Sequence, residues 1–434
     1  MMPAPLQIPR GFRFAAAACG LKSRGLDLAL LSCDAPAAAA AVFTTNRVQA
    51  APVRLSRAHL RQSRGWARAV VVNSGNANCA TGPAGDRVAQ ATATAAARLL
   101  DCSARQVFVC STGVIGVPLP VENILRALPG LSRTAAHTPQ AFHAFTRAIL
   151  TTDTRPKWAA ARCRIQGRTV RLLGCAKGAG MIAPRMATML AFLVTDAALA
   201  PPLLQRMLRA AVAETFNRIT VDGDTSTNDT VVLLASGAAG GRRLALPRFR
   251  ADRRAATPAE RDALRFYRTL DSVCRSLALQ IVADGEGAQR VVEIEVRGAR
   301  SAAAAERVAR AVAESPLVKT ALAGADPNWG RILAAAGRAG VAFDPARATI
   351  WLAGIKVFAH GRPLCFDERH AHRRLSGDYV SIVLDLGAAR QRSRIETRTS
   401  ARQTGHLPQA TSRCIFWTCD FTREYVDLNA RYRS

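Results

Sequence analysis

The sequence predicts a mixed α/β protein in which strands and helices recur along the whole chain, and three segments carry this prediction. Residues 67–73 form an apolar run that ends in a loop rich in Gly and Asn, as expected of a buried strand. Between Arg290 and Val296, apolar and polar residues alternate with the period of a half-buried strand. Between Pro201 and Phe216, apolar residues recur at the spacing of an amphipathic helix.

The remaining elements follow from the same two patterns, taken in chain order. An Ala-rich stretch at 87–100 is typical of a helix, and the short apolar run at 106–110 of a strand. Later segments repeat this alternation without a low-complexity linker. We expect a helix at 264–281, a loop at 283–288, a helix at 302–313, strands within 349–358 around Gly354, and Arg-rich surface insertions at 240–254 and 388–408.

Size and composition exclude several classes of protein. The length of 434 residues allows two or three domains, or one large one. With 49% apolar and 21% charged residues, the chain can bury a core and is not generally disordered. The longest apolar runs, 37–43 and 186–194, fall well short of the roughly 18 residues that a membrane-spanning helix needs. We therefore expect no membrane span.

The net charge of +29 is a feature that many nucleic-acid-binding proteins share. However, 55 of the 60 basic residues are Arg, they are scattered along the chain, and only 6% of residues are aromatic and able to stack on bases. We expect solvated surface charge and no nucleic-acid partner, and we keep a basic nucleic-acid-binding protein as the alternative from another class. The eleven cysteines form no C-x-x-C pair, which favours free thiols over a zinc site or a disulfide framework.

Three short segments could carry chemistry. Thr112 and Gly113 follow the predicted strand at 106–110, where backbone N–H groups could form an oxyanion hole. Residues 151–154 add hydroxyls and an acid. Lys177 precedes a Gly-rich turn that leads through Thr188 into an apolar run, and by itself Thr188 would be an ordinary strand residue. None of these segments is specific alone.

The acidic stretch from Asp222 to Asp229 invites a calcium-binding interpretation. An EF-hand loop needs Gly at its sixth position and Glu at its twelfth, and this stretch has Thr227 and Leu233 there. A hydrogen-bonded cluster of turns is the favoured interpretation, and we expect no metal site.

Nine ordered motifs together resemble the glutamate N-acetyltransferase/ornithine acetyltransferase family of arginine biosynthesis. The resemblance runs from about Gly11 to Ser434 and is far more specific than any single motif. The motifs are Val42–Arg47, Asn73–Asn78, Ser111–Gly116, Thr151–Thr154, Lys177–Ala197, Phe216–Asp229, Ala283–Gly287, Gly324–Arg331 and Glu424–Ser434.

The resemblance implies an α/β layered sandwich with two domains, of the self-cleaving N-terminal-nucleophile type. Cleavage between Ala187 and Thr188 would give an N-terminal chain of residues 1–187 with the oxyanion hole, and a C-terminal chain of residues 188–434 with the nucleophile. A threonine at a new N-terminus has a free α-amine beside its hydroxyl, and the pKa of such an amine in peptides is about 7.7–8.0. This amine can serve as the general base that an internal threonine lacks.

By resemblance, the reaction is a ping-pong transfer of acetyl from N2-acetylornithine to glutamate. Thr188 would be the nucleophile, and Thr112 with Gly113 would form the oxyanion hole. The family's substrate-binding positions fall on Thr151, Lys177, Thr188, Glu286, Asn429 and Ser434. The sequence departs from the family pattern at Gln289–Arg290, and the segment 388–408 before the terminal motif is longer than expected.

The resemblance also implies a cytoplasmic enzyme without a cofactor, assembled as α2β2 from the two cleaved chains. Bifunctional members also take acetyl from acetyl-CoA, and no phosphate-binding signature decides whether this chain does. The alternative within enzymes is a related N-terminal-nucleophile amidase or aminopeptidase, in which water replaces glutamate as the acceptor.

Overall fold

A computed structural model of the chain describes residues 6–183, 189–251, 256–387 and 412–430. These residues form two compact units, each with its own sheet. The described residues up to 217, together with 222–285, form the first unit, while 218–221 and 286–430 form the second. The units therefore divide after residue 285, and the predicted cleavage after Ala187 falls within the sequence of the first unit.

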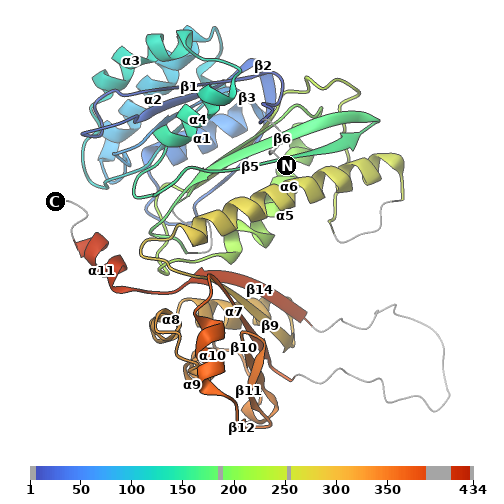
Figure 1. Cartoon of the computed structure of the whole chain (residues 1–434). Helices are drawn as coiled ribbons and strands as arrows, with labels where there is room; N and C mark the ends of the chain where they lie inside the picture. The colour runs from blue at the N-terminus through green and yellow to red at the C-terminus, as the bar shows by residue number, and fades with distance from the viewer. Residues whose placement is uncertain (1–5, 184–188, 252–255, 388–411, 431–434) are drawn as a thin grey trace. The chain divides into compact units, whose positions relative to one another are not determined.

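The first unit contains an eight-stranded mixed sheet with the order β4-β3-β2-β8-β7-β6-β5, and β1 pairs with β2. The long helix α6 (Pro258–Ala283) lies along β5 and β6 (Figure 1). Neighbours are antiparallel except for β3 with β4 and β7 with β8. β7 and β8, which follow the predicted junction in sequence, lie between β2 and β6, which precede it. The strands are β1 (Phe12–Ala17), β2 (Leu28–Phe43), β3 (Trp66–Asn73), β4 (Val107–Ser111), β5 (Lys157–Ile165), β6 (Arg168–Lys177), β7 (Leu190–Thr195) and β8 (Thr230–Ala235).

Both faces of this sheet are covered by apolar side chains. Along β3, Val70 and Val72 join one hydrophobic cluster, while Ala69 and Val71 join another. Successive side chains of a strand point to opposite faces, so the two clusters lie on opposite sides of the sheet. This double burial explains why the predicted strand is an unbroken apolar run. The helices of this unit are α1 (Ala51–Gln62), α2 (Gly82–Leu99), α3 (Val121–Arg133), α4 (Pro139–Ala148), α5 (Pro201–Glu214) and α6 (Pro258–Ala283).

The predicted helices and strands of this unit are confirmed, with differences at their ends. α6 begins six residues earlier than predicted because Thr257 and Glu260 form a reciprocal capping box at its N-terminus. The prediction missed the sixteen-residue strand β2. Its Ala-rich second half has no alternation, and its register shifts between Ser32 and Ala37, around Pro36.

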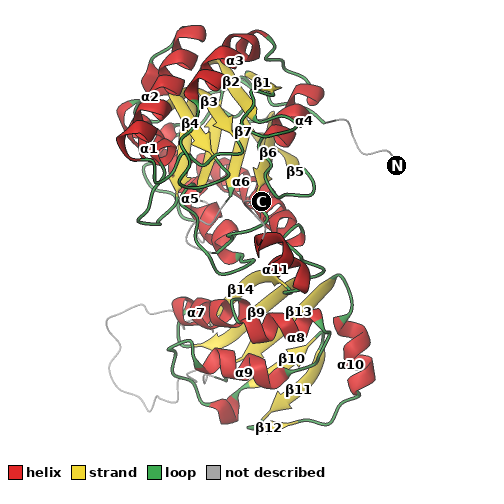
Figure 2. Ribbon diagram, turned by 90° about the vertical axis from the view of Figure 1, so that its left-hand side faces the viewer, coloured by secondary structure: helices red, strands yellow, loops and turns green. Residues whose placement is uncertain are grey.

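The second unit contains a six-stranded sheet with the order β12-β11-β10-β13-β9-β14, on which α7, α8 and α9 pack (Figure 2). The predicted alternation is confirmed in β9, where Val292, Ile294 and Val296 are buried and the intervening glutamates are partly exposed. The elements are β9 (Val291–Ala299), α7 (Ala302–Ala313), α8 (Pro316–Ala323), α9 (Trp329–Gly337), β10 (Thr349–Leu352), β11 (Ile355–Ala359), β12 (Arg362–Pro363), α10 (Glu368–Leu375), β13 (Tyr379–Asp385), β14 (Ser412–Cys419) and α11 (Arg423–Ala430).

The remaining predictions concern the two insertions, the cysteines and membrane-spanning helices. The predicted insertion at 240–254 is mostly exposed where it is described, but buried Leu244 anchors it by bridging to Leu199. The insertion at 388–408 lies outside the described residues. All eleven cysteines are free thiols, as predicted. Among the described helices, none has the length and apolar character needed to cross a bilayer.

Candidate active site

The predicted oxyanion residues lie where two loops of the first unit meet at the end of β4. Asn76, in the Gly/Asn-rich loop after β3, forms bridges with both Thr112 and Val114. Gly113 has a φ of +131°, and a Cβ atom added to it would lie 2.3 Å from the carbonyl carbon of Gly75. Only glycine fits this position, because any side chain would collide with a neighbouring backbone.

Lys177 brings three of the predicted site residues together. It is the last residue of β6, and it is only 2% exposed. Its ammonium group donates to Thr151 Oγ1 at 2.7 Å and to Thr112 Oγ1 at 3.4 Å. Since both hydroxyls accept from the lysine, each keeps its own proton to donate elsewhere.

Asp153 contacts several residues of this cluster, and its side chain is fully shielded from water. Its carboxylate accepts from the N–H of Thr151 at 3.1 Å and from the N–H of Gly178 at 2.6 Å. It also pairs with Lys157 at 2.6 Å and with Lys177 at 3.8 Å. Burial alone would raise the pKa of Asp153, but the two ammonium groups outweigh it and lower the pKa to about 2.

A second buried carboxylate completes the charge balance. Lys157, at the start of β5, also pairs with Asp284 at 2.5 Å. Asp284 is the residue that follows α6, and it accepts from both the N–H and the hydroxyl of Thr154. Lys157, Lys177, Asp153 and Asp284 thus form a buried network with two charges of each sign. Sequence analysis missed Lys157 and Asp284 because their pairing joins residues far apart in the chain.

The acidic loop 222–229 contacts backbone on both sides of the predicted junction. Asp222 accepts from the N–H groups of Met181 and Ile182, the latter at 2.8 Å. Asp229 is fully buried and accepts from the N–H of Met189 at 2.9 Å. Burial raises the pKa of Asp222 to about 6. Burial also raises the pKa of Asp229 well above its usual range, although the Met189 N–H and the charge of Lys177 oppose this.

Asn228 ties the acidic loop to the oxyanion loops. Its side-chain amide donates to the carbonyl of Ala77 at 2.7 Å and to the carbonyl of Ser111 at 2.8 Å. The loop after β2 joins from another side, since Thr44 Oγ1 donates to the carbonyl of Ser226 at 2.7 Å. Four motifs that sequence analysis had noted separately therefore converge at one end of the sheet. Within the described ranges, no group of three His, Cys, Asp or Glu side chains is placed to hold a metal ion.

Two other predicted residues meet in the second unit. The amide of Asn429, on α11, donates to Glu286 Oε2 at 2.7 Å. Thr422 Oγ1 donates to the carbonyl of Gly287 at 2.7 Å, so the chain just before the terminal motif contacts the Glu286 loop. Ala187, Thr188 and Ser434 lie outside the described residues.

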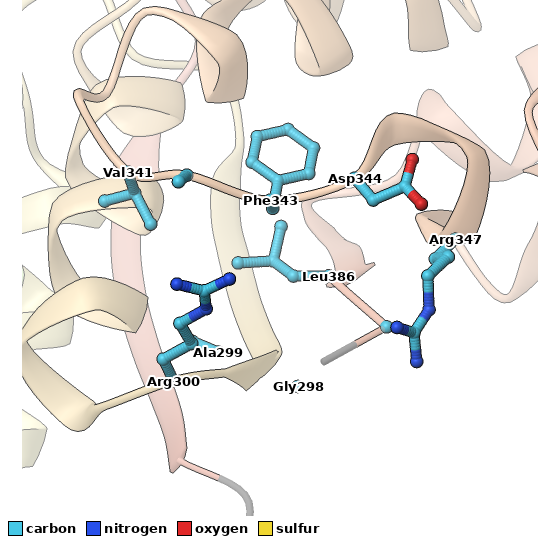
Figure 3. A pocket seen from close by; sticks show the side chains of 10 residues that line it. Gly298, Ala299, Arg300, Val341, Phe343, Asp344, Arg347 and Leu386 are labelled. Atoms are coloured by element: carbon cyan, nitrogen blue, oxygen red, sulfur yellow. The ribbon is translucent and has the colours of Figure 1, made fainter. Parts of the chain in front are cut away.

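The second unit also contains a cavity of 270 Å³ that includes none of the predicted site residues. Figure 3 shows Phe343 and Leu386 at its apolar side, with Arg300 and Arg347 along its edge. We assign no function to it.

Comparisons with known proteins agree with the resemblance. The model of the ArgJ family matches residues 13–434. A relative from Thermosynechococcus vestitus is 45% identical, over 98% of this chain and 96% of its own length. A relative from Chlorobaculum tepidum is 44% identical, over 98% and 96%. Both are named arginine biosynthesis bifunctional protein ArgJ.

Solved structures include two that are 38% identical to this chain where they align. One is the arginine biosynthesis bifunctional protein ArgJ of Bacillus halodurans, with a TM-score of 0.45 over 54% of this chain and 95% of that one. The other is the ornithine acetyltransferase of Mycobacterium tuberculosis complexed with ornithine, with a TM-score of 0.36 over 41% of this chain and 92% of that one.

Proposed function

This chain belongs to the ArgJ family, and from that premise we propose that it is an arginine-biosynthesis enzyme that transfers acetyl from N2-acetylornithine to glutamate. The observation that carries the proposal is the buried ammonium group of Lys177, which contacts the hydroxyls of Thr151 and Thr112. A buried cation beside two hydroxyls suits a substrate that brings both a carboxylate and a reacting acetyl carbonyl.

The nucleophile in this proposal is Thr188, released by cleavage of the bond after Ala187. The cut consumes one water, leaves a carboxylate on Ala187 and gives Thr188 a free α-amine. Because the pKa of an α-amine in peptides is about 7.7–8.0, this amine can take the hydroxyl proton at neutral pH. The products would be chains of residues 1–187 and 188–434.

In the first half-reaction, Thr188 Oγ bonds to the acetyl carbon, its proton passes to the α-amine, and the bond to the N2 nitrogen breaks. The departing ornithine amine takes up that proton. In the second half-reaction, the amine of glutamate bonds to the acetyl carbon, the bond from that carbon to Thr188 Oγ breaks, and the proton lost by the glutamate nitrogen returns to Thr188 Oγ. The hydroxyl of Thr112 and the N–H of Gly113 would stabilise the oxyanion in both steps, and loss of one such donor typically costs about 10²–10³ in kcat.

The remaining predicted residues would bind substrate. Lys177 and Thr151 suit a substrate carboxylate, and the carboxylate of Glu286 suits an ammonium group of ornithine. The hydrogen bond between Asn429 and Glu286 supports a shared role for these two residues. The terminal Ser434 would complete this set, as the family resemblance implies.

The same family membership supports further parts of the proposal. The two cleaved chains would assemble as α2β2 in the cytoplasm, without a metal or cofactor. Acetyl-CoA would be a second acetyl donor, as the word bifunctional in the names of the relatives suggests.

Denaturing electrophoresis and an acetyl-transfer assay test the proposal together. Active wild-type protein of 46.3 kDa should appear as fragments of about 20 and about 26 kDa by residue share. Thr188→Ala should stay uncut and transfer no acetyl from N2-acetylornithine to glutamate. An intact band in fully active enzyme would overturn the cleavage step.

Incubation of the wild type with N2-acetylornithine, with and without glutamate, separates transfer from hydrolysis. We expect N-acetylglutamate when glutamate is present and little free acetate when it is absent. Equal release of acetate in both samples would instead indicate an amidase in which water is the acceptor. Addition of acetyl-CoA and glutamate alone tests the second donor.

A further inference from the structure

The acidic loop from Asp222 to Asp229 resembles a metal-binding loop in composition, yet its two end carboxyl groups contact backbone. Asp222 binds the chain just before the undescribed segment 184–188, and Asp229 binds it immediately after. In the sequence, the predicted junction between Ala187 and Thr188 lies between the residues that make these two contacts.

The upstream contact holds an unusual backbone. Met181 has a φ of +55°, in the left-handed region that a residue with a side chain rarely adopts. Asp222 accepts from its N–H and, with the other carboxyl oxygen, from the N–H of Ile182. Such strained conformations persist only where surrounding contacts hold them, and here one carboxyl group supplies two of those contacts.

The downstream contact is closer to the junction. Asp229 Oδ1 accepts from the N–H of Met189, the residue that follows Thr188, at 2.9 Å. The N–H of Thr230 donates to the carbonyl of Met189 at 3.1 Å, so consecutive residues of the loop and β8 hold both polar groups of Met189. Within the described residues, Asp229 Oδ2 makes no hydrogen bond.

The loop itself is held firmly enough to serve as an anchor. Asn228 fastens it to the carbonyls of Ala77 and Ser111, directly beside the predicted oxyanion residues. Asn46 donates to the carbonyl of Thr225 at 2.8 Å, and the N–H of Thr44 donates to the carbonyl of Asp229 at 3.0 Å. A displacement of the loop would therefore disturb several elements at once.

We propose that Asp222 and Asp229 are positioning residues for the cleavage after Ala187, because each holds described backbone on one side of that bond. This inference rests on the proposed self-cleavage. Attack within a chain is fast only when the reacting atoms are held close, and a misplacement of 1 Å can cost about 100-fold in rate. In this role Asp229 acts only by accepting the Met189 N–H, with no base or acid function of its own.

The test measures the rate of cleavage of the full chain. Each variant is pulse-labelled during cell-free synthesis, and loss of the 46.3 kDa precursor is followed by denaturing electrophoresis. Asp229→Ala should slow cleavage about 10- to 100-fold because Met189 loses its anchor. Asp229→Asn should stay within about threefold of wild type, since an amide oxygen also accepts the Met189 N–H.

Two further variants complete the set. Asp222→Ala should slow cleavage through the other flank, and it keeps the test meaningful if Asp229→Ala fails to fold by circular dichroism. Asp224→Asn is the matched control, because Asp224 is an exposed acid of the same loop, and it should be cut at the wild-type rate.

The outcomes separate this inference from the proposed function. If the wild-type chain is never cut, the proposed function itself is wrong. If the wild type is cut, and folded Asp229→Ala and Asp222→Ala proteins are cut equally fast, then only the positioning role is overturned. An Asp229→Asn protein as slow as Asp229→Ala would also overturn it, because the carboxyl group would then act through its ionisation.

Discussion

Asp153 and Asp229 lie in the same unit, and both side chains are shielded from water, yet their pKa values are shifted in opposite directions. Asp153 faces Lys157 and Lys177, and its pKa is lowered to about 2. Asp229 accepts from the backbone N–H of Met189, and burial raises its pKa although that N–H and the charge of Lys177 oppose the rise. The partners of a buried carboxyl group, and not its burial alone, therefore decide the direction in which its pKa moves.

The largest expected effect comes from making the same substitution at both positions. Asp153→Asn removes a charge that two buried lysines need, and loss of one partner of a buried pair typically costs about 3–5 kcal/mol of the free energy of unfolding. Asp229→Asn keeps an oxygen that can accept from the N–H of Met189 and should cost about 1 kcal/mol or less. Urea denaturation of the two proteins measures the difference. Similar losses in the free energy of unfolding would show that Asp153 and Asp229 do not differ in this way.

The next effect is on the pH dependence of stability. A carboxyl group with a lowered pKa and one with a raised pKa change the stability in opposite directions as the pH rises. Asp153, with its lowered pKa, contributes stability above about pH 4 that is lost as the pH falls towards 2. Asp222, with a pKa of about 6, contributes stability that is fully present below about pH 4 and is lost as the pH rises through 6.

Substitution isolates the contribution of Asp222. The difference in free energy of unfolding between wild type and Asp222→Asn should fall by about 2–3 kcal/mol from pH 4 to pH 7. Denaturation series at several pH values measure it. A difference that is constant with pH would mean that Asp222 ionises normally in the folded chain.

The smallest expected effect comes from Thr151, which contacts the buried charged network through Lys177. Thr151→Val removes one hydrogen bond of Lys177 and leaves its ion pair with Asp153 in place. One such bond is worth about 1 kcal/mol, so we expect KM for N2-acetylornithine to rise about fivefold while the stability changes little. An unchanged KM would show that Thr151 does not help Lys177 to bind substrate.

How much the sequence could predict depends on whether a feature is local. The alternation in β9 and the bounds of α7 follow from neighbouring residues, and both are confirmed. The pairing of Lys157 with Asp284 joins positions 127 residues apart, so no local pattern could reveal it. The acidic loop was visible as a cluster, but only the fold shows that its carboxyl groups bind backbone at Met181 and Met189.

The strand order of the first unit has a consequence for any cut after Ala187. β7 and β8 come from the downstream piece, and they are inserted between β2 and β6 of the upstream piece. The two products would stay interleaved through shared ladders of hydrogen bonds and would co-purify until a denaturant separates them. Scission would therefore have to come after the sheet is complete, and the halves, made as separate polypeptides, would each lack the neighbours that their strands need.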